Sequence, residues 1–125
     1  MSKLKIVEEN EATVVSFLDV AFLDETSIKE LGDELENLVK AKPKPVLVIN
    51  FSNVDYLSSA VLGRLVKIYK LIKASTGKLL LCHIKNNIMQ VFKITKLDKM
   101  FEIFPDQEKA LRSLKGAGFK FFWQK

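Results

Sequence analysis

The chain opens with short apolar runs separated by polar turns and then changes to helical spacing. Residues 4–8 and 12–18 are rich in β-branched and aromatic side chains and predict two short strands, with a third edge segment at 21–23. The polar stretch that follows suits a helix start. Apolar side chains then recur every three or four positions and predict an amphipathic helix over 26–41, at Ile28, Leu31, Leu35, Leu38 and Val39.

Two apolar strands and the helix between them form the centre of the sequence. Residues 46–51 and 79–82 are apolar at almost every position, which is typical of strands buried on both faces of a parallel sheet. Helical periodicity predicts a helix over 59–74, and Gly77 is placed for a left-handed cap after it. Strand, helix and strand in this order predict a parallel βαβ unit.

The last third of the pattern is shorter and more broken. Asn86 or Asn87 is expected to cap a short helix, residues 100–103 predict a last strand, and a final helix should run from Pro105 to Gly116. The predicted fold is therefore an α/β domain with a mixed central sheet of about five strands and about four helices. We expect one domain over 1–114, followed by a separate tail over 115–125.

Composition agrees with one soluble domain. The chain has 125 residues, of which 48% are hydrophobic and 28% charged. No apolar run approaches the roughly 20 residues that a membrane-spanning helix needs, so no membrane association is expected. The first residues lack the apolar stretch of a signal peptide, and a single cysteine cannot form an internal disulfide, so we expect a cytoplasmic protein.

Charge is divided unevenly along the sequence. Residues 1–63 carry 6 basic and 11 acidic side chains, whereas residues 64–125 carry 14 basic and 4 acidic ones. A basic stripe recurs every three positions along the second predicted helix, at Arg64, Lys67, Lys70 and Lys73. Such a stripe is either a solvated helix face or a docking surface for an acidic partner or a nucleic-acid backbone.

Catalytic and metal-binding patterns are absent from the sequence. Cys82 and His83 are neighbours in a predicted strand, where successive side chains point to opposite faces, so they are not expected to form a dyad. One cysteine and one histidine do not supply the usual metal ligands, and the five glycines form no phosphate-binding loop. We expect no enzyme activity, no metal and no cofactor.

The tail carries four aromatic side chains in five residues, at Phe119, Phe121, Phe122 and Trp123. Packing onto the domain and a self-association or partner site are both consistent with this pattern.

Function in open α/β sheets gathers beyond the carboxyl ends of strands, which here is the loop 52–59. Ser58 and Ser59 stand at the expected helix start. A serine there serves as a helix cap, or as a phosphorylation site whose phosphate meets unpaired amides at the positive end of the helix. The residues alone leave both readings open.

The segment 46–63 contains Asn50-Phe51-Ser52-Asn53-Val54 followed by Asp55-Tyr56-Leu57-Ser58-Ser59-Ala60-Val61-Leu62-Gly63. With these residues the segment resembles the signature of STAS domains. More narrowly, it is similar to the bacterial anti-sigma factor antagonists. Leu23-Asp24, the stretch 77–81 and the stretch 91–104 resemble further parts of that pattern, so the resemblance covers about residues 4–114. Ser58 stands where the family has Asp, Ala60 where it has Ser or Thr, and Val61 where it has Gly.

The resemblance implies a function by partner switching. An unmodified antagonist binds an anti-sigma factor that is also a serine kinase, phosphorylation ends the binding, and a serine phosphatase restores it. Ser59 aligns with the phosphorylated serine, and Ser58 is the second choice. The residues implied in partner binding are Asp24, Asp55, Tyr56, Leu57, Ser58, Ser59, Ala60, Val61, Arg64 and Lys67.

The sequence is also compatible with two other hypotheses. The chain could be a STAS-like scaffold whose serines only cap a helix, or a small basic nucleic-acid-binding protein. The preferred interpretation involves no direct contact with nucleic acid and a monomer or weak dimer.

Overall fold

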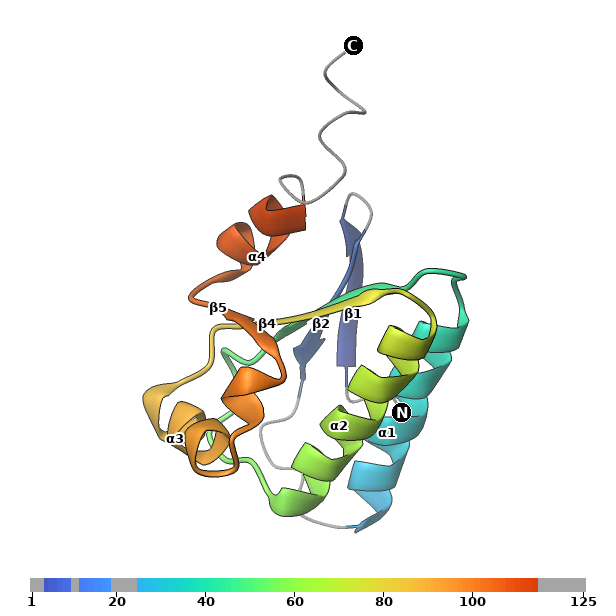
Figure 1. The fold of residues 1–125 in the computed structure, drawn as a ribbon. Helices are drawn as coiled ribbons and strands as arrows, with labels where there is room; N and C mark the ends of the chain where they lie inside the picture. The colour runs from blue at the N-terminus through green and yellow to red at the C-terminus, as the bar shows by residue number, and fades with distance from the viewer. Residues whose placement is uncertain (1–3, 10–11, 19–24, 115–125) are drawn as a thin grey trace.

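The computed structural model describes residues 4–9, 12–18 and 25–114, and they form three layers with a five-stranded sheet in the middle (Figure 1). The strands are β1 Leu4–Glu9, β2 Ala12–Phe17, β3 Val46–Asn50, β4 Lys78–Cys82 and β5 Glu102–Phe104. The helices are α1 Glu25–Lys40, α2 Ser59–Ala74, α3 Asn86–Ile94 and α4 Gln107–Leu114, with a short 3₁₀ helix at Leu97–Lys99. The predicted α/β class and mixed sheet are confirmed.

The strands lie in the sheet in the same order as in the sequence. β1 and β2 are antiparallel, and β2, β3, β4 and β5 are parallel to one another. The helices α1 and α2 therefore cross between neighbouring parallel strands, and both begin at the carboxyl edge of the sheet. The predicted βαβ unit is β3, α2 and β4. Among the described residues, no helix is long and apolar enough to span a bilayer.

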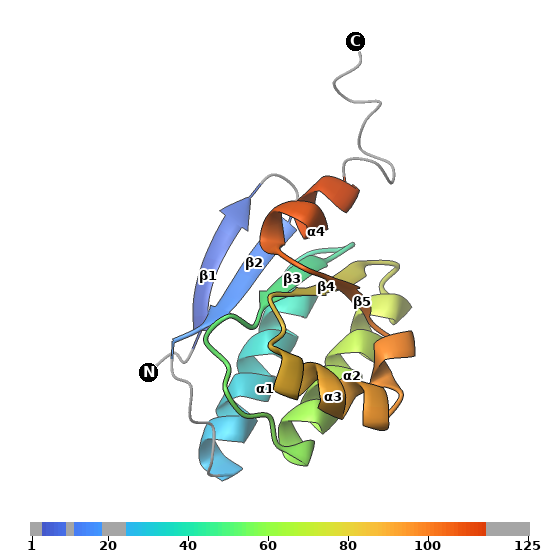
Figure 2. The same cartoon turned by 90° about the vertical axis from the view of Figure 1, so that its left-hand side faces the viewer.

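Alternate side chains of the strands pack against opposite layers. The larger core lies on the side of α1, α2 and α3, where it includes Val15, Ile49 and Leu81. The smaller core lies under α4 and includes Val48 and Leu80. Figure 2 shows α4 alone on its face of the sheet. Both faces of β3 and β4 are covered, which explains why those strands have almost no polar positions.

The turn between α2 and β4 corrects the predicted role of Gly77. The left-handed residue is Thr76, with φ of 56°, and the φ of Gly77 is not positive. Glycine is needed at 77 because a Cβ there would lie 2.0 Å from the Pro45 carbonyl oxygen. That oxygen accepts a hydrogen bond from the Lys78 amide at 2.9 Å. The close approach of the backbones at Pro45 and Gly77 therefore belongs to the pairing at the start of β3 and β4.

Two predictions in the last third were also wrong. The N-cap of α3 is Lys85, which makes no side-chain capping bond, and neither Asn86 nor Asn87 caps the helix. The last strand begins at Glu102, two residues later than predicted, because Met100 and Phe101 donate backbone hydrogen bonds to Leu97 and extend the preceding turn.

The remaining boundaries agree with prediction to within one or two residues. Asp106 Oδ1 accepts a hydrogen bond from the Lys109 amide at 2.8 Å and starts α4 as expected. The predicted edge segment 21–23 and the aromatic tail 115–125 lie outside the described residues, as does Asp24.

Candidate functional site

The candidate site is the connection between β3 and α2, at the carboxyl edge of the parallel strands. Its backbone is fixed by hydrogen bonds that come from several elements. The Phe51 amide donates to the Cys82 carbonyl at 2.9 Å, and the Val54 amide donates to the Phe51 carbonyl at 2.9 Å. Asn53 Nδ2 donates to the Phe17 carbonyl at 3.2 Å. The loop is therefore held by both strands that flank β3.

Asn50 links this loop to the other side of the sheet. Its side-chain oxygen accepts from the Ser52 amide at 2.8 Å, and its Nδ2 donates to Gln107 Oε1 of α4 at 3.0 Å. Val54 is 1% exposed and Leu57 is 6% exposed, so two apolar side chains anchor the loop in the larger core. This anchoring presents the residues between them, and the start of α2, in a fixed position.

The structure distinguishes the contacts of the two serines, for which the residues alone left both the cap and the phosphorylation reading open. Ser58 is the N-cap of α2, with extended backbone angles, and its Oγ accepts a hydrogen bond from the Val61 amide at 3.2 Å. Ser59 is the first helical residue and is exposed. Within the described ranges, the Ser59 hydroxyl has no hydrogen-bond partner. Only Ser58 is therefore engaged as a cap.

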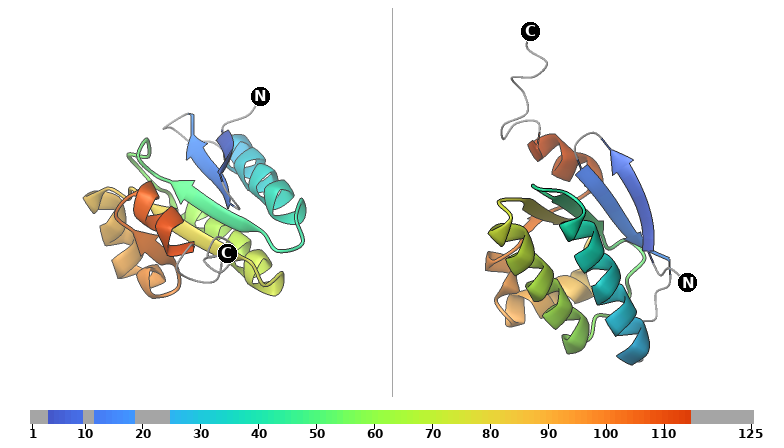
Figure 3. Two further views of the ribbon diagram at one scale, coloured as in Figure 1. Left: turned by 90° about the horizontal axis from the view of Figure 1, so that it is seen from above. Right: turned by 90° about the vertical axis from the view of Figure 1, so that its right-hand side faces the viewer.

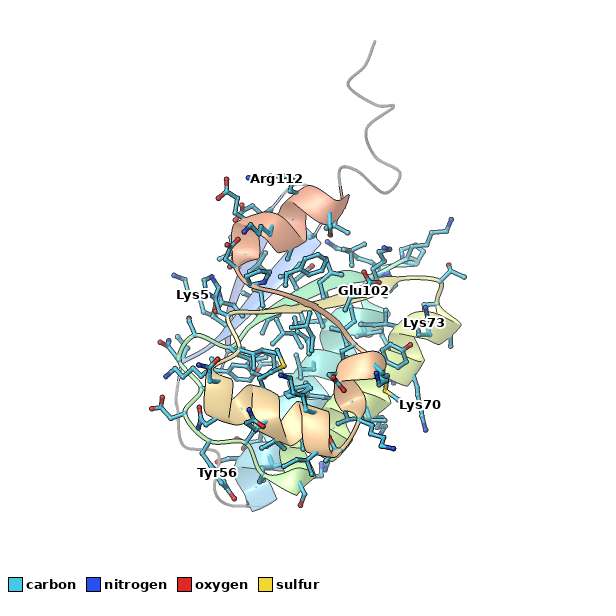
Figure 4. The ribbon with its side chains drawn as sticks, turned by 60° about the vertical axis from the view of Figure 1, so that its left-hand side comes forward. Lys5, Tyr56, Lys70, Lys73, Glu102 and Arg112 are labelled. Atoms are coloured by element: carbon cyan, nitrogen blue, oxygen red, sulfur yellow. The ribbon has the colours of Figure 1, made fainter. Side chains whose placement is uncertain are left out.

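The predicted binding residues around these serines divide into exposed and buried groups. Ser59 and Ala60 are exposed on the first turn of α2, and Tyr56 keeps 60% of its surface exposed. Figure 4 shows Tyr56 at the end of the molecule where α1 and α2 begin, with its ring directed away from the protein. Leu57 and Val61 instead face the core, at 6% and 2% exposure, so they shape the site from below.

Asp55 is held by residues that follow the neighbouring strand. Lys85 forms an ion pair with its carboxylate, and Asn87 Nδ2 donates to its backbone carbonyl at 3.1 Å. Neither Lys85 nor Asn87 was predicted to belong to this site. Their place directly after β4 was the available signal, because the carboxyl ends of parallel strands meet at one edge.

Three of the four basic side chains in the stripe on α2 contact other residues of the chain. Arg64 is half-buried and packs its side chain over Gly32 of α1, where a Cβ would come within 2.9 Å of its Cδ. Lys67 forms an ion pair with Glu36 at 2.9 Å, and Lys73 lies 5.9 Å from the ring centre of Tyr69. The Lys67 contact lowers the pKa of the Glu36 carboxyl below its usual value.

An open hollow of about 340 Å³ lies beside the start of α2. Its lining residues are Ile28 and Lys29 of α1 and Ala60 and Arg64 of α2. Two of the four are cations, so the hollow favours an acidic group close to Ser59. Lys29 also forms an ion pair with Asp33 at 3.0 Å on the exposed surface of α1.

Cys82 and His83 form no reactive pair. Cys82 is fully buried under α4, and burial raises the pKa of its thiol to about 11. The thiol is therefore not a nucleophile near neutral pH. His83 follows the strand with a positive φ of 58° and is half-buried, as expected for a strand-end residue.

Known proteins resemble both this sequence and this fold. BtrV of Bordetella bronchiseptica, a protein named as an anti-sigma factor antagonist, is 30% identical to this chain over 71 residues. The match covers 57% of this chain and 61% of BtrV, so the chain spans about three fifths of that relative.

Solved structures match over most of the chain. An anti-sigma factor antagonist (STAS) domain protein of Planctomyces limnophilus superposes with a TM-score of 0.80 and 22% identity, covering 90% of this chain and 97% of that one. The Bacillus cell fate determinant SpoIIAA in its phosphorylated form has a TM-score of 0.68 and 14% identity, covering 89% and 98%. At these identities the structures establish the fold.

The sequence signature of the STAS domain matches residues 5–110, which include every described strand and helix except the end of α4 and the first residue of β1. The matched segment contains the β3–α2 connection together with the two strands on either side of it. This chain belongs to the STAS domain family.

Proposed function

We propose that the chain is an anti-sigma factor antagonist that binds an anti-sigma factor with serine kinase activity. In this proposal, phosphorylation of Ser59 ends the binding, and a serine phosphatase reverses it. The observation that carries the assignment is the division between the two serines. The Ser58 hydroxyl is engaged as the cap of α2, and the Ser59 hydroxyl is exposed without a hydrogen-bond partner in the described part of the chain.

The surroundings of Ser59 favour a phosphate that leaves the fold intact. The first turn of α2 contains no acidic side chain, and the helix start carries the positive end of the helix dipole. Lys29 and Arg64 line the adjoining hollow, and Asp55 is already paired with Lys85. A new charge at Ser59 would therefore lie at the positive end of the helix, next to a hollow with two cations in its lining.

The same charge opposes a bound partner. A phosphoserine adds roughly −1.5 to −2 charges at neutral pH. Burying that charge in an interface without matching cations costs several kcal/mol, and about 1.4 kcal/mol corresponds to a tenfold loss in affinity. Exposed Tyr56 supplies the aromatic side chain that interface centres often use, close to the position that changes charge.

The proposal is tested by affinity capture from a lysate of the organism that encodes the chain. The baits are the unmodified protein, Ser59→Asp, and Asn37→Asp as a matched charge control on the exposed far part of α1. We expect the unmodified and Asn37→Asp baits to retain an anti-sigma factor with serine kinase activity, identified by mass. Ser59→Asp should retain at least tenfold less of it.

Kinase specificity gives the second part of the test. The captured protein and ATP should place one phosphate on the unmodified chain and none on Ser59→Ala, with the position determined by mass spectrometry. A phosphate mapped to Ser58 would contradict the assignment of Ser59. Equal retention of the same partner by all three baits would leave the chain as a STAS scaffold without this switch.

A further inference from the structure

The edge strand β1 presents an unusually open surface. It pairs with β2 and with no other strand among the described residues, and positions 5–9 are all exposed. Ile6 and Val7, in its middle, keep 39% and 41% of their surface exposed. The right-hand view of Figure 3 shows β1 at the edge of the molecule, with no helix of the described residues beyond it. The opposite edge, β5, has three residues, whereas β1 has six.

Natural edge strands usually carry features that prevent pairing, such as prolines, bulges or a central charge. β1 has no proline or glycine, and its centre is apolar and β-branched. Its charges lie at its two ends, with Lys5 at the start and Glu8 and Glu9 at the finish. Opposite charges at opposite ends repel a parallel copy of the same strand and attract an antiparallel copy.

We propose that β1 pairs with β1 of a second copy of this chain, antiparallel and about a two-fold axis at Val7. The two sheets then join into one continuous sheet of ten strands. The partner is identical, so the surface must be complementary to itself. The sequence of β1 meets that requirement because Lys5 and Glu9 carry opposite charges at equal distances from the apolar Val7.

The face of the sheet fixes the register. Antiparallel pairing about such an axis places residues of the same face opposite each other, so the centre must lie on one residue. Lys5, Val7 and Glu9 share the face of α4, because their partners on β2 are Ser16, Val14 and Ala12. Centring on Val7 places Val7 opposite itself and Lys5 opposite Glu9 of the second copy.

The alternative register is less complementary. Centring on Ile6 would place Lys5 opposite Val7 and Leu4 opposite Glu8, which leaves both charges against apolar side chains. In the register centred on Val7, Lys5 and Glu9 gain partners that they lack within the described part of their own chain. Figure 4 shows Lys5 on the opposite side of the molecule from Lys70 and Lys73 of α2.

The other face of β1, which carries Leu4, Ile6 and Glu8, is also compatible with the register centred on Val7. Ile6 lies opposite Glu8 of the second copy, and the Glu8 carboxylate is already bound within its own chain. Lys42 Nζ lies 2.7 Å from Glu8 Oε1, and Thr13 Oγ1 donates to Glu8 Oε2 at 2.9 Å. These contacts hold the charge against β2 and the connection between α1 and β3, so Ile6 meets the aliphatic part of Glu8.

A pairing of two six-residue strands buries less than the roughly 1,200–2,000 Å² of a standard interface, so the dimer should be weak. We expect a dissociation constant on the order of ten micromolar. Figure 2 shows the start of α2 at the end of the molecule that points away from the sheet and from β1, so self-pairing of β1 leaves it accessible in both copies.

The test is sedimentation equilibrium of the full chain over a wide range of concentrations. The unmodified protein should change from monomer to dimer, and Val7→Lys should remain monomeric because it places two like charges at the axis. Ile94→Lys is the matched control, since Ile94 is a 78% exposed apolar residue on α3. It should dimerise like the unmodified chain. Unchanged thermal unfolding would show that each variant is folded.

Charge exchange tests the register itself. Lys5→Glu should weaken the dimer at least fivefold, and adding Glu9→Lys to it should restore the original dissociation constant. Both positions face uncharged residues on β2, so the exchange leaves contacts within the chain nearly unchanged. A protein that is monomeric at all concentrations, or a dimer that Val7→Lys does not disrupt, would overturn the proposal. Failure of the exchange to restore pairing would overturn the register.

Discussion

The two ends of α2 both contain small residues, but for different reasons. After the helix, Gly77 is required by packing, since a Cβ would lie 2.0 Å from the Pro45 carbonyl oxygen. Near the start, a Cβ added at Gly63 would meet nothing within 4 Å, and Ala60 and Ser59 are exposed. The small residue after the end of α2 is therefore required by the fold, whereas those near its start are not.

We propose that the start of α2 is adapted to contacts outside the chain, and this difference supports the proposal. Glycine inside a helix costs about 1 kcal/mol relative to alanine, so Gly63 lowers stability without a compensating contact in the described structure. A flat surface formed by Ser59, Ala60 and Gly63 over the first two turns of α2 lets another backbone approach closely. The variants below test whether the two ends differ as described.

The largest effect is expected at the end of α2 that serves the fold. Gly77→Ala should lower the free energy of unfolding by about 3 kcal/mol, because the Pro45 backbone cannot move without disturbing the pairing of β3 and β4. Urea unfolding measures the change. A loss below about 0.5 kcal/mol would show that the close approach is not needed for folding.

A bulky residue at Gly63 should separate binding from stability. Gly63→Gln meets no atom of its own chain and adds a good helix former, so the fold should be retained. Its side chain would occupy the space that we assign to the partner, and we expect at least a tenfold loss in affinity for the captured anti-sigma factor. Titration calorimetry with that protein measures the loss. Unchanged affinity would place the interface elsewhere.

The two serines should differ in their effect on stability. Ser58→Ala removes the hydroxyl that accepts from the Val61 amide and should cost about 1 kcal/mol. Ser59→Ala removes no hydrogen bond of the described structure and should change stability by less than about 0.5 kcal/mol. Thermal and urea unfolding of the two variants provide the comparison. Equal losses would mean that both hydroxyls support the helix.

The smallest effect is a gain in stability. Gly63→Ala should raise the free energy of unfolding by about 0.5–1 kcal/mol, because alanine restricts the unfolded chain and fits the helix without contact. This variant is also the matched control for Gly77→Ala, since the same substitution is expected to act in opposite directions at the two positions. A loss of stability at Gly63 would contradict the account of an unconstrained position.

The sequence predicted the long periodic elements well. The predicted range 59–74 coincides with α2, because its apolar positions recur over four turns. The predictions that failed depend on single backbone groups. Thr76 rather than Gly77 takes the left-handed conformation, and Lys85 rather than an asparagine precedes α3. Residue type alone does not determine which residue adopts the left-handed conformation or precedes a helix, because these also depend on the hydrogen bonds that the neighbouring strands make.

The candidate site was located from the sequence, but its internal roles were not. Both serines have the chemistry of a cap, and only the extended backbone at Ser58 shows which hydroxyl reaches the Val61 amide. The contacts of Asp55 with Lys85 and Asn87 join positions 30 and 32 residues apart, so local periodicity gave no indication of them.

The central claim is that Ser59 controls partner binding without supporting the fold. Its most direct test uses the chain prepared with phosphoserine at position 59, and a second preparation with phosphoserine at position 58. Both the dissociation constant for the captured anti-sigma factor and the midpoint of thermal unfolding are measured. We predict that phosphoserine at 59 weakens binding at least a hundredfold and leaves the midpoint nearly unchanged, whereas phosphoserine at 58 lowers the midpoint. Unchanged affinity with phosphoserine at 59 would contradict the account.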